Sequence, residues 1–257
     1  MSFSADSRSA RQYDGEPVAS LAARWQVAAV HAYGAVGSTL DVAHALAPAS
    51  EAGTLVLADE QTAGRGRHGR RWASAAGAGI WLALVERPTD ARALDVLALR
   101  CGLFAAEALD ELAGAAVRVK WPNDLYVGDR KLAGTLIETR WRGTAPEWVA
   151  IGFGLNLVSP DAGNAIGLVP GVGRLAALDR VVPALRRAAA ASRHLSEGEL
   201  ERWRERDLSV GRQVTEPADG VVQGISPSGE LLIATEEGRI IAHRSGSLTF
   251  AAALPCS

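Results

Sequence analysis

The sequence predicts an α/β protein (α+β in some schemes), with a mixed β-sheet flanked by helices and a small C-terminal β-barrel. Two observations support this fold class. Strand-like and helix-like segments alternate along the 257-residue chain as far as about residue 206. Past Leu208, short β-runs separated by turn signals replace the helices, with the spacing of a barrel of roughly 50 residues. We therefore expect one domain over residues 28–206 and a second over residues 207–257.

Residues 1–27 are expected to form an N-terminal extension. Met1 to Ser20 is rich in Ser, Arg, Asp and Gly, which is typical of a disordered or loosely attached segment. The segment lacks the apolar core of a signal peptide. No apolar run in the chain approaches the ~20 residues of a membrane span.

The first half of the larger domain contains three strand-like runs and two helical patterns. The strands are expected over residues 28–33, 54–58 and 79–85. Gly37-Ser38-Thr39 resembles a turn with a helix N-cap, and Pro48 ends the short helix that follows. Residues 91–112 carry the longest helical pattern, with apolar residues three and four apart, and Gly114 is its stop signal.

The second half of the domain contains four strand-like runs and two helical patterns. The strands are expected over residues 117–120, 125–127, 132–140 and 147–157, and the helices over residues 180–195 and 197–206. Gly128-Asp129 indicates a hairpin turn between two of these strands. The barrel strands are expected over residues 213–215, 221–225, 231–234, 239–243 and 248–250.

Composition places the protein among ordinary globular chains. Lys and Arg total 27 and Asp and Glu total 29, a net charge of −2, which argues against general binding to nucleic acid. The two cysteines, Cys101 and Cys256, suggest neither a disulfide framework nor a zinc site. With no signal peptide or membrane span in view, a reducing cytoplasm is the expected location.

A dense basic loop between two apolar β-runs is the most informative feature. Residues 59–72 read Asp-Glu-Gln-Thr-Ala-Gly-Arg-Gly-Arg-His-Gly-Arg-Arg-Trp. Glycine allows close backbone approach to a ligand, and arginine offers a planar charged fork suited to carboxylates and phosphates. Trp72 offers a flat face on which a base stacks. Because the charge is local, its target is expected to be a small molecule that carries an acid group and a nucleotide.

Taken alone, an arginine–glycine loop is more often a solvated or nucleic-acid-binding segment. Its position between β-runs, with Trp72 attached, favours a binding site instead. Other conspicuous residues also have plain structural interpretations. Trp121 is expected to be core packing, Gly152 and Gly154 could form a bulge, and Ser38 could be an N-cap only.

Two further segments complete a set of motifs. One reads Lys-Trp-Pro-Asn-Asp over residues 120–124 and continues through Lys131, Gly134 and Glu138; the other reads Gly-Phe-Gly-Leu-Asn over residues 152–156. Together with the basic loop, these segments resemble the biotin protein ligases in residues, order and spacing. The resemblance covers roughly residues 28–252. It is specific because the first two motifs are long, whereas the Gly-x-Gly-x-Asn match alone is weak.

The resemblance implies a fold and a reaction. The fold is the class II synthetase-like fold of biotin and lipoate ligases, with an SH3-like barrel at the C-terminus. The reaction uses ATP to convert biotin to biotinyl-5′-AMP, and then transfers it to a lysine of the biotin carboxyl carrier domain of a carboxylase. Mg²⁺ is implied by the ATP chemistry, although the sequence indicates no ligand set. No DNA or membrane partner is expected, and a homodimer through the central sheet is left open.

The short N-terminal extension is also informative within this resemblance. Regulatory family members carry an additional DNA-binding domain, whereas only about 28 residues precede the first core strand here. The sequence therefore predicts the ligase-only form.

The resemblance also implies roles for individual residues. The expected catalytic residues are Arg65, Arg67, Lys131 and Asp124. The expected biotin-binding residues are Ser38, Thr39, Gln61, Arg65, Gly66, Arg67, Lys131, Gly134 and Gly154. The expected ATP- and adenylate-binding residues are Arg67, Arg70, Trp72, Lys120, Asn123, Lys131 and Asn156. These types suit the chemistry, because fixed cations let two anions meet and neutral hydroxyl and amide groups match a ureido ring.

One position departs from the family pattern. The family's Ser-Thr-Asn is replaced by Ser38-Thr39-Leu40, followed by Asp41, which puts one biotin-side contact in question. Three alternative functions also remain open. They are a lipoate or octanoate ligase of the same fold, a nucleic-acid-binding module that uses the basic loop, and a biotin binder without catalytic activity.

Overall fold

A seven-stranded sheet forms the centre of the protein. The computed structural model describes residues 9–160, 163–191 and 193–251. The strand order is β3-β4-β5-β9-β8-β7-β6, with β3 parallel to β4 and every other neighbouring pair antiparallel. The strands are β3 Ala29–Val36, β4 Thr54–Gln61, β5 Gly79–Glu86, β6 Arg118–Lys120, β7 Asp124–Val127, β8 Arg130–Arg142 and β9 Ala145–Asn156. The expected mixed sheet is confirmed.

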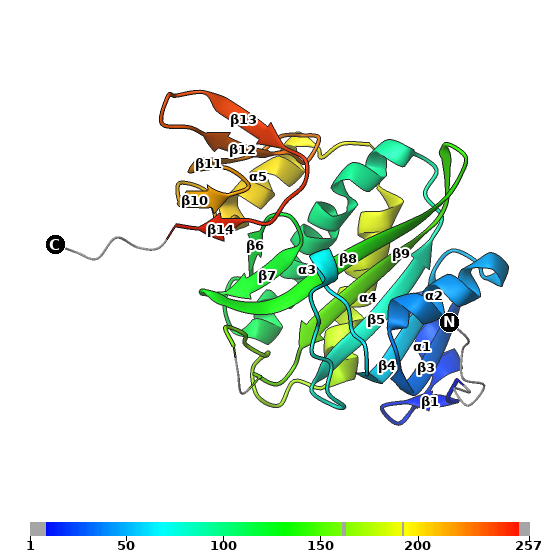
Figure 1. The fold of residues 1–257 in the computed structure, drawn as a ribbon. Helices are drawn as coiled ribbons and strands as arrows, with labels where there is room; N and C mark the ends of the chain where they lie inside the picture. Colours follow the sequence, from blue (N-terminus) through cyan, green and yellow to red (C-terminus); the bar gives the residue numbers. More distant parts are fainter. Residues whose placement is uncertain (1–8, 161–162, 192, 252–257) are drawn as a thin grey trace.

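Helices cover both faces of this sheet (Figure 1). Three helices, α1 Val18–Trp25, α3 Leu97–Ala113 and α4 Arg174–Ala190, pack on one face, and α2 Thr39–Leu46 packs on the other. Strand β4 shows why both faces are buried: Leu55 and Leu57 join the core under α3 and α4, whereas Val56 and Ala58 join the core under α2. A strand buried on both faces reads as a continuous apolar run, as residues 54–58 do.

A second, smaller sheet follows helix α5, Glu197–Arg206. Its order is β13-β12-β11-β10-β14, and all its pairs are antiparallel. The strands are β10 Gln213–Glu216, β11 Gly220–Ile225, β12 Leu231–Ala234, β13 Ile240–His243 and β14 Thr249–Phe250. Among the described residues no pairing joins β13 to β14, so a five-stranded antiparallel sheet is observed and closure into a barrel stays a prediction.

The two sheets are connected by buried hydrogen bonds. The Trp121 indole N–H donates to the carbonyl of Gly229 at 3.0 Å, and Leu208 N–H donates to the carbonyl of Val119 at 2.8 Å. Trp121 is 2% exposed, in agreement with its expected packing role. These contacts fix the small sheet beside β6 and β7, next to the segments that carry the motifs.

The N-terminal segment corrects one expectation. Within residues 9–27, strands β1 Gln12–Tyr13 and β2 Glu16–Pro17 precede helix α1, so this part has a fixed fold and is not disordered; residues 1–8 lie outside the described residues. Leu21 and Trp25, one helical turn apart, are buried in the core. The Trp25 indole N–H also donates to Asp179 Oδ1 on α4 at 2.8 Å. The buried side chains of Leu21 and Trp25 hold this segment against the core although its average composition is polar. An average composition does not show which positions carry the apolar side chains.

Two helix boundaries also differ from expectation. The pattern over residues 91–112 begins as a 3-10 helix, η3 Ala91–Val96, with Asp90 as its N-cap, and becomes α-helical at Leu97. Helix α4 begins six residues earlier than the expected residue 180 and includes Pro183. Gly114 ends α3 in the left-handed conformation, as expected. Cys101 is buried and free, whereas Cys256 lies outside the described residues.

Within the described residues, no helix combines the length and apolar character that crossing a membrane would require.

Candidate functional site

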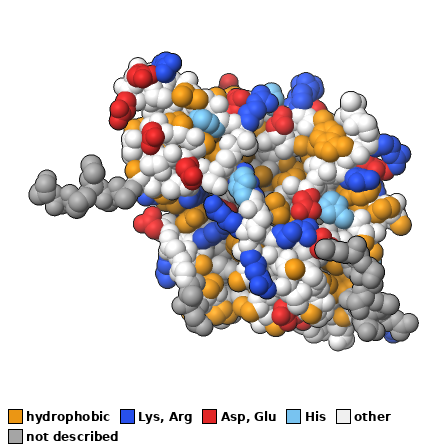
Figure 2. Space-filling model, viewed as in Figure 1, with side chains coloured by type: hydrophobic (Ala, Val, Ile, Leu, Met, Phe, Trp, Pro, Cys, Tyr) orange, Lys and Arg blue, Asp and Glu red, His pale blue; other side chains and the backbone are white. Residues whose placement is uncertain are grey.

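The motif segments meet in one pocket on the α2 face of the large sheet. It lies between the basic loop, the start of α2, the β6–β7 turn and strands β8 and β9, with Ser247 and Leu248 contributed from beside β14. Figure 2 shows Lys and Arg side chains gathered over the middle of this face. The expected site residues that line the pocket are Ser38, Thr39, Gln61, Arg65, Gly66, Arg67, Arg70, Trp72, Lys120, Asn123, Asp124, Lys131, Gly134 and Gly154.

The basic loop folds back on itself at the pocket's edge. Gly66 N–H donates to the carbonyl of Arg70 at 2.7 Å, and Trp72 N–H donates to the carbonyl of Gly64 at 2.9 Å. His68 and Gly69, at the tip, take positive φ angles of 55° and 71°. Arg71 donates to the carbonyl of Thr62 at 2.9 Å and so belongs to the loop's own structure. The alternation of arginine and glycine thus forms a tight hairpin that directs successive side chains to different sides.

Trp72 packs into a gap made by two glycines. Gly134 on β8 and Gly154 on β9 are directly paired, so neither strand projects a side chain there. A Cβ at Gly154 would lie 2.7 Å from the Trp72 indole nitrogen. The Lys131 ammonium lies 5.0 Å from the Trp72 ring centre, within the range of a cation–π contact. Glycine is therefore required at Gly154 for space and not for an unusual backbone angle.

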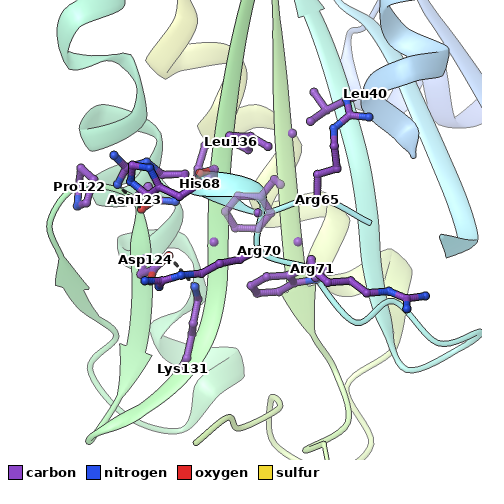
Figure 3. Close-up of a pocket in the computed structure, with 18 of the residues that line it drawn as sticks. Leu40, Arg65, His68, Arg70, Arg71, Pro122, Asn123, Asp124, Lys131 and Leu136 are labelled. Atoms are coloured by element: carbon purple, nitrogen blue, oxygen red, sulfur yellow. Dashed lines mark hydrogen bonds and ion pairs between the residues drawn. The ribbon is translucent and has the colours of Figure 1, made fainter. Parts of the chain in front are cut away.

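Lys131 and Asp124 form an ion pair at the pocket's floor. The Lys131 Nζ lies 2.7 Å from Asp124 Oδ1, and both side chains are less than one third exposed. Strand pairing places them together, since Asp124 begins β7 and Lys131 lies near the start of β8. Figure 3 shows Arg70 extending toward the same carboxylate.

Among the described residues, Arg67, Arg70 and Lys120 form no ion pair with a carboxylate, although Asp124 lies on the same side of the pocket. Burial lowers the pKa of Arg67, and the neighbouring Arg70 lowers it further, although Asp124 acts in the opposite direction. Burial also lowers the pKa of Lys120, and the neighbouring cations lower it further, although Asp124 raises it. The Arg67 guanidinium donates only a long hydrogen bond, 3.5 Å, to Asn123 Oδ1. A bound anion would relieve this repulsion, so the arrangement favours an anionic ligand.

Neutral polar groups line the opposite end. The Thr39 amide and hydroxyl both donate to Gln61 Oε1, at 2.9 and 3.0 Å. Gln61 Nε2 donates to the Ser74 hydroxyl at 2.9 Å, which fixes the orientation of the Gln61 amide. Ser38 caps α2 by accepting from Leu40 N–H at 3.3 Å and is 1% exposed. Ser38 therefore acts as an N-cap and lines the pocket at the same time.

Leu40 and Asp41 show what the departure from the family pattern does. The Leu40 side chain is 3% exposed and packs over Gly152, where an added Cβ would lie 3.0 Å from it. It presents an apolar wall where the family pattern has an amide. Asp41 does not replace that amide, because it turns outward and accepts a hydrogen bond from Arg65 at 2.6 Å.

Arg65 and Asn156 lie differently from the other expected site residues. Arg65 extends toward Leu40, away from Lys131 and Asp124 (Figure 3), and contacts Asp41 and Glu138. Asn156 is outside the pocket lining; its side-chain amide donates to the carbonyls of Lys131 and Ile166 at 3.4 and 3.3 Å. It braces the backbone that carries Lys131.

Sequence reasoning missed several lining residues. Thr135, Leu136 and Pro122 fall inside the motif segments, and Leu136, two positions from Gly134 on the same strand, could have been indicated by strand alternation. Ser247 and Leu248 are more than 90 residues from the nearest motif, and no local signal marks them. Among the described residues, no cluster of three or more His, Cys, Asp or Glu side chains is arranged to hold a metal ion.

Comparisons with known proteins agree with this fold and pocket. The biotin/lipoate A/B protein ligase family model matches residues 36–156. The biotin–[acetyl-CoA-carboxylase] ligase of Paracoccus denitrificans is 35% identical over 217 residues, which is 76% of this chain and 89% of that protein. The ligase of the same name from Mycobacterium tuberculosis is 32% identical and covers 75% of this chain and 77% of its own length.

A longer relative and a solved structure extend the comparison. The bifunctional ligase/repressor BirA of Escherichia coli is 34% identical over 199 residues, and this chain spans about three fifths (62%) of its length. The biotin protein ligase of Aquifex aeolicus in complex with biotin and ATP matches with a TM-score of 0.69 and 27% identity, covering 86% of this chain and 99% of that chain.

The mixed sheet and the position of the pocket agree with the family match, which covers the segments that carry the motifs. The chain belongs to the biotin/lipoate A/B protein ligase family, and the relatives from Paracoccus denitrificans and Mycobacterium tuberculosis, each matching about three quarters of it, are biotin–[acetyl-CoA-carboxylase] ligases.

Proposed function

We propose that this protein activates biotin with ATP and transfers the biotinyl group to a lysine of a carboxylase's carrier domain. The observation that carries the proposal is the pocket's charge imbalance. Arg67, Arg70, Lys120 and Lys131 face a space in which Asp124 is the one carboxylate among the lining residues. Related biotin protein ligase structures from Aquifex aeolicus, one in complex with biotin and ATP and one in complex with biotin, support biotin and ATP as substrates.

In the first step, a biotin carboxylate oxygen attacks the α-phosphorus of ATP and the bond to the β-phosphate oxygen breaks, releasing pyrophosphate. Two anions must approach each other, so cations fixed between them lower the barrier. We assign this role to Arg67 and Lys131, with Arg70 and Lys120 on the phosphate side. Their desolvation matters because a charge held in a half-buried pocket acts through a lower effective dielectric than one in water.

The neutral end of the pocket is proposed to hold the biotin ring. Ser38, Thr39 and Gln61 offer hydroxyl and amide groups, which match a ureido group without placing a charge beside it. Leu40 is proposed to contact the ring's apolar part. The Trp72 indole, seated over the two glycines, is proposed to stack with adenine.

In the second step, an amine attacks the acyl carbon of the adenylate and AMP leaves. A lysine amine with an ordinary pKa near 10.4 must lose a proton first. We propose that Asp124 orients the lysine and receives this proton, which requires it to leave its ion pair with Lys131. A carrier domain of a biotin-dependent carboxylase is the proposed partner.

Three further assignments accompany this proposal. Residues 28–206 would act as the catalytic domain, and residues 207–257 would form a second domain that contributes Ser247 and Leu248 to the pocket. Mg²⁺ would neutralise charge on the triphosphate. Because Asp124 is already engaged, the ion fits here as one held mainly by phosphate oxygens, the usual arrangement for Mg²⁺. The cytoplasm remains the proposed location.

Pyrophosphate release with ATP and each candidate acid tests the function. Biotin should support release and lipoate or octanoate should not. Mass spectrometry after addition of a carrier-domain fragment should then show one added biotinyl group on the carrier. Release with lipoate alone, or no release with any acid, would refute the proposal. A gel shift at low salt that shows tight duplex binding would instead favour the nucleic-acid reading.

A further inference from the structure

Arg65 is held outside the phosphate side of the pocket by two carboxylates. Its Nη1 donates to Asp41 Oδ1 at 2.6 Å, and its Nη2 lies 3.2 and 3.3 Å from the two oxygens of Glu138. Asp41 belongs to α2 and Glu138 to β8, so one guanidinium bridges two elements. In Figure 3, Arg65 and Arg70 extend in different directions from the loop, toward Leu40 and toward Asp124 respectively.

Glu138 is itself held by a further pair of side chains. The Trp148 indole N–H donates to His44 Nδ1 at 3.0 Å, and His44 Nε2 lies 3.0 Å from Glu138 Oε2. An indole nitrogen only donates, so His44 Nδ1 must accept and the ring proton must be on Nε2, which donates to Glu138. The chain from Trp148 through His44 therefore orients the Glu138 carboxylate toward Arg65.

The charges in this cluster separate Arg65 from its neighbours in the loop. Two carboxylates face Arg65, whereas Asp124 is paired with Lys131 and also attracts Arg67. An arginine that is already neutralised has little charge left to attract a phosphate. It is well placed for a different task, because it is the first arginine of the loop and its backbone pairs with Arg71 across the hairpin.

We propose that Glu138 and Asp41 are positioning residues that hold Arg65 as a latch, fixing the base of the basic loop against α2 and β8. The inference rests on the proposed function in one respect: a loop latched in this way keeps the activated biotinyl adenylate in the pocket until the carrier lysine arrives. Glu138 and Asp41 then act, through Arg65, on the retention of the intermediate.

The decisive variants are Arg65→Lys, Glu138→Gln and Asp41→Asn, with Glu111→Gln as the control. Lysine keeps the positive charge but cannot bridge two carboxylates with a planar fork. Glu111 also pairs with an arginine, Arg180, at 2.9 Å, but on helices away from the pocket. The first measurement is hydrogen exchange at the loop amides of Gly66 and Trp72, relative to amides of the central strands. The second is release of biotinyl adenylate in the absence of carrier, beside the rate of the pyrophosphate burst.

The latch predicts about two- to fivefold faster exchange at the loop amides and about two- to fivefold faster adenylate release in Arg65→Lys and Glu138→Gln, the range expected for a partly exposed ion pair. In Glu138→Gln, the burst rate should stay close to that of the unaltered protein, because Glu138 does not line the pocket. Combining Glu138→Gln with Arg65→Lys should add little to either change, because both remove the same contact. Glu111→Gln should leave both measurements unchanged.

Two results would overturn the latch. The first is that Arg65→Lys retains slow loop exchange and slow adenylate release while Arg65→Ala loses the pyrophosphate burst, since that pattern belongs to a catalytic cation. The second is that loop exchange in Glu138→Gln equals that of the unaltered protein. If biotin and ATP give no burst in the unaltered protein, the proposed function fails, and the exchange measurement on the free protein still tests the latch by itself.

Discussion

Arg100 and Arg67 show two opposite ways of burying an arginine. Arg100, on α3, is 1% exposed and donates to both oxygens of Glu199, at 2.6 and 3.2 Å, and to the carbonyl of His194 at 2.9 Å. Arg67, in the basic loop, is also partly desolvated, yet the structure gives it one long hydrogen bond to Asn123. Glu199 neutralises the charge of Arg100 within the protein. Arg67 forms no ion pair with a carboxylate among the described residues, so its charge is available to a bound anion.

This difference separates a structural cation from a functional one more clearly than exposure does. A desolvated charge without a partner raises the free energy of the folded protein, so it persists only where it serves another purpose. The cost at Arg67 is reduced because the pocket is open to solvent. The four following predictions test this contrast by removing or creating partners for buried charges.

The largest effect is expected from breaking the compensated pair. Glu199→Ala should leave Arg100 buried with no counter-charge and lower the free energy of unfolding by about 3–5 kcal/mol. Part of this loss, about 1 kcal/mol, comes from the N-cap of α5, because Glu199 also bonds to Ser196. Urea denaturation measures it. The double variant Arg100→Met with Glu199→Gln removes both charges and should lose less than half as much; an equal loss would contradict the argument.

The second prediction concerns the uncompensated side. Arg67→Ala and Lys131→Ala should each slow adenylate formation by about 10²–10³-fold, because each removes a cation placed where negative charge develops. The free energy of unfolding should change little for Arg67→Ala, since removing a desolvated charge offsets the loss of its attraction to Asp124. Single-turnover pyrophosphate release measures the chemical step. Arg180→Ala, which alters an exposed pair on α4, is the control. If adenylate formation in Arg67→Ala is as fast as in the unaltered protein, Arg67 has a structural role like that of Arg100 and the argument is wrong.

The sequence could not have made this distinction, although much else was predictable from it. The mixed sheet followed from runs such as residues 79–85, where burial on both faces leaves a continuous apolar segment. The members of the pocket followed from the motifs, because their residue types and spacing carry the chemistry. Arg65 and Arg67 stand two positions apart in one motif, yet one pairs with Asp41 and Glu138 and the other does not. Partnerships of that kind depend on which distant segments meet.

Two other features were invisible for the same reason. Helix α1 lies in a polar stretch, and it is held by Leu21 and Trp25 against a core that only the complete fold creates. Ser247 and Leu248 reach the pocket because the small sheet docks beside β6. Contacts between segments far apart in sequence leave no periodic trace in either segment, so local patterns do not predict them.

The third prediction creates an additional uncompensated cation. Asp124→Asn should leave Lys131 unpaired and tighten ATP binding by roughly threefold to tenfold, because the pocket gains net positive charge. Transfer to the carrier should fall by about 10²-fold if Asp124 receives the lysine proton. Comparing the KM for ATP with the rate of carrier biotinylation separates the two effects. Weaker ATP binding, together with unchanged transfer, would show that Asp124 serves only to orient Lys131.

The smallest effect is expected at the Arg65 latch, which resembles Arg100 in being compensated but lies nearer the surface. A hydrogen bond from His44 lowers the pKa of Glu138 below its ordinary 4.5, and Arg65 adds to this shift, whereas burial opposes it. A lowered carboxyl pKa contributes stability above pH 4.5 that is lost as the pH falls through the folded-state value.

Protection of the Gly66 and Trp72 amides, corrected for intrinsic exchange, should therefore drop below pH 4.5 by roughly two- to fivefold, the range of a partly exposed ion pair. Glu138→Gln should flatten the profile, because it removes the carboxylate that titrates in this range. A profile that is identical in Glu138→Gln and the unaltered protein would mean that the carboxylate of Glu138 contributes nothing to holding the loop.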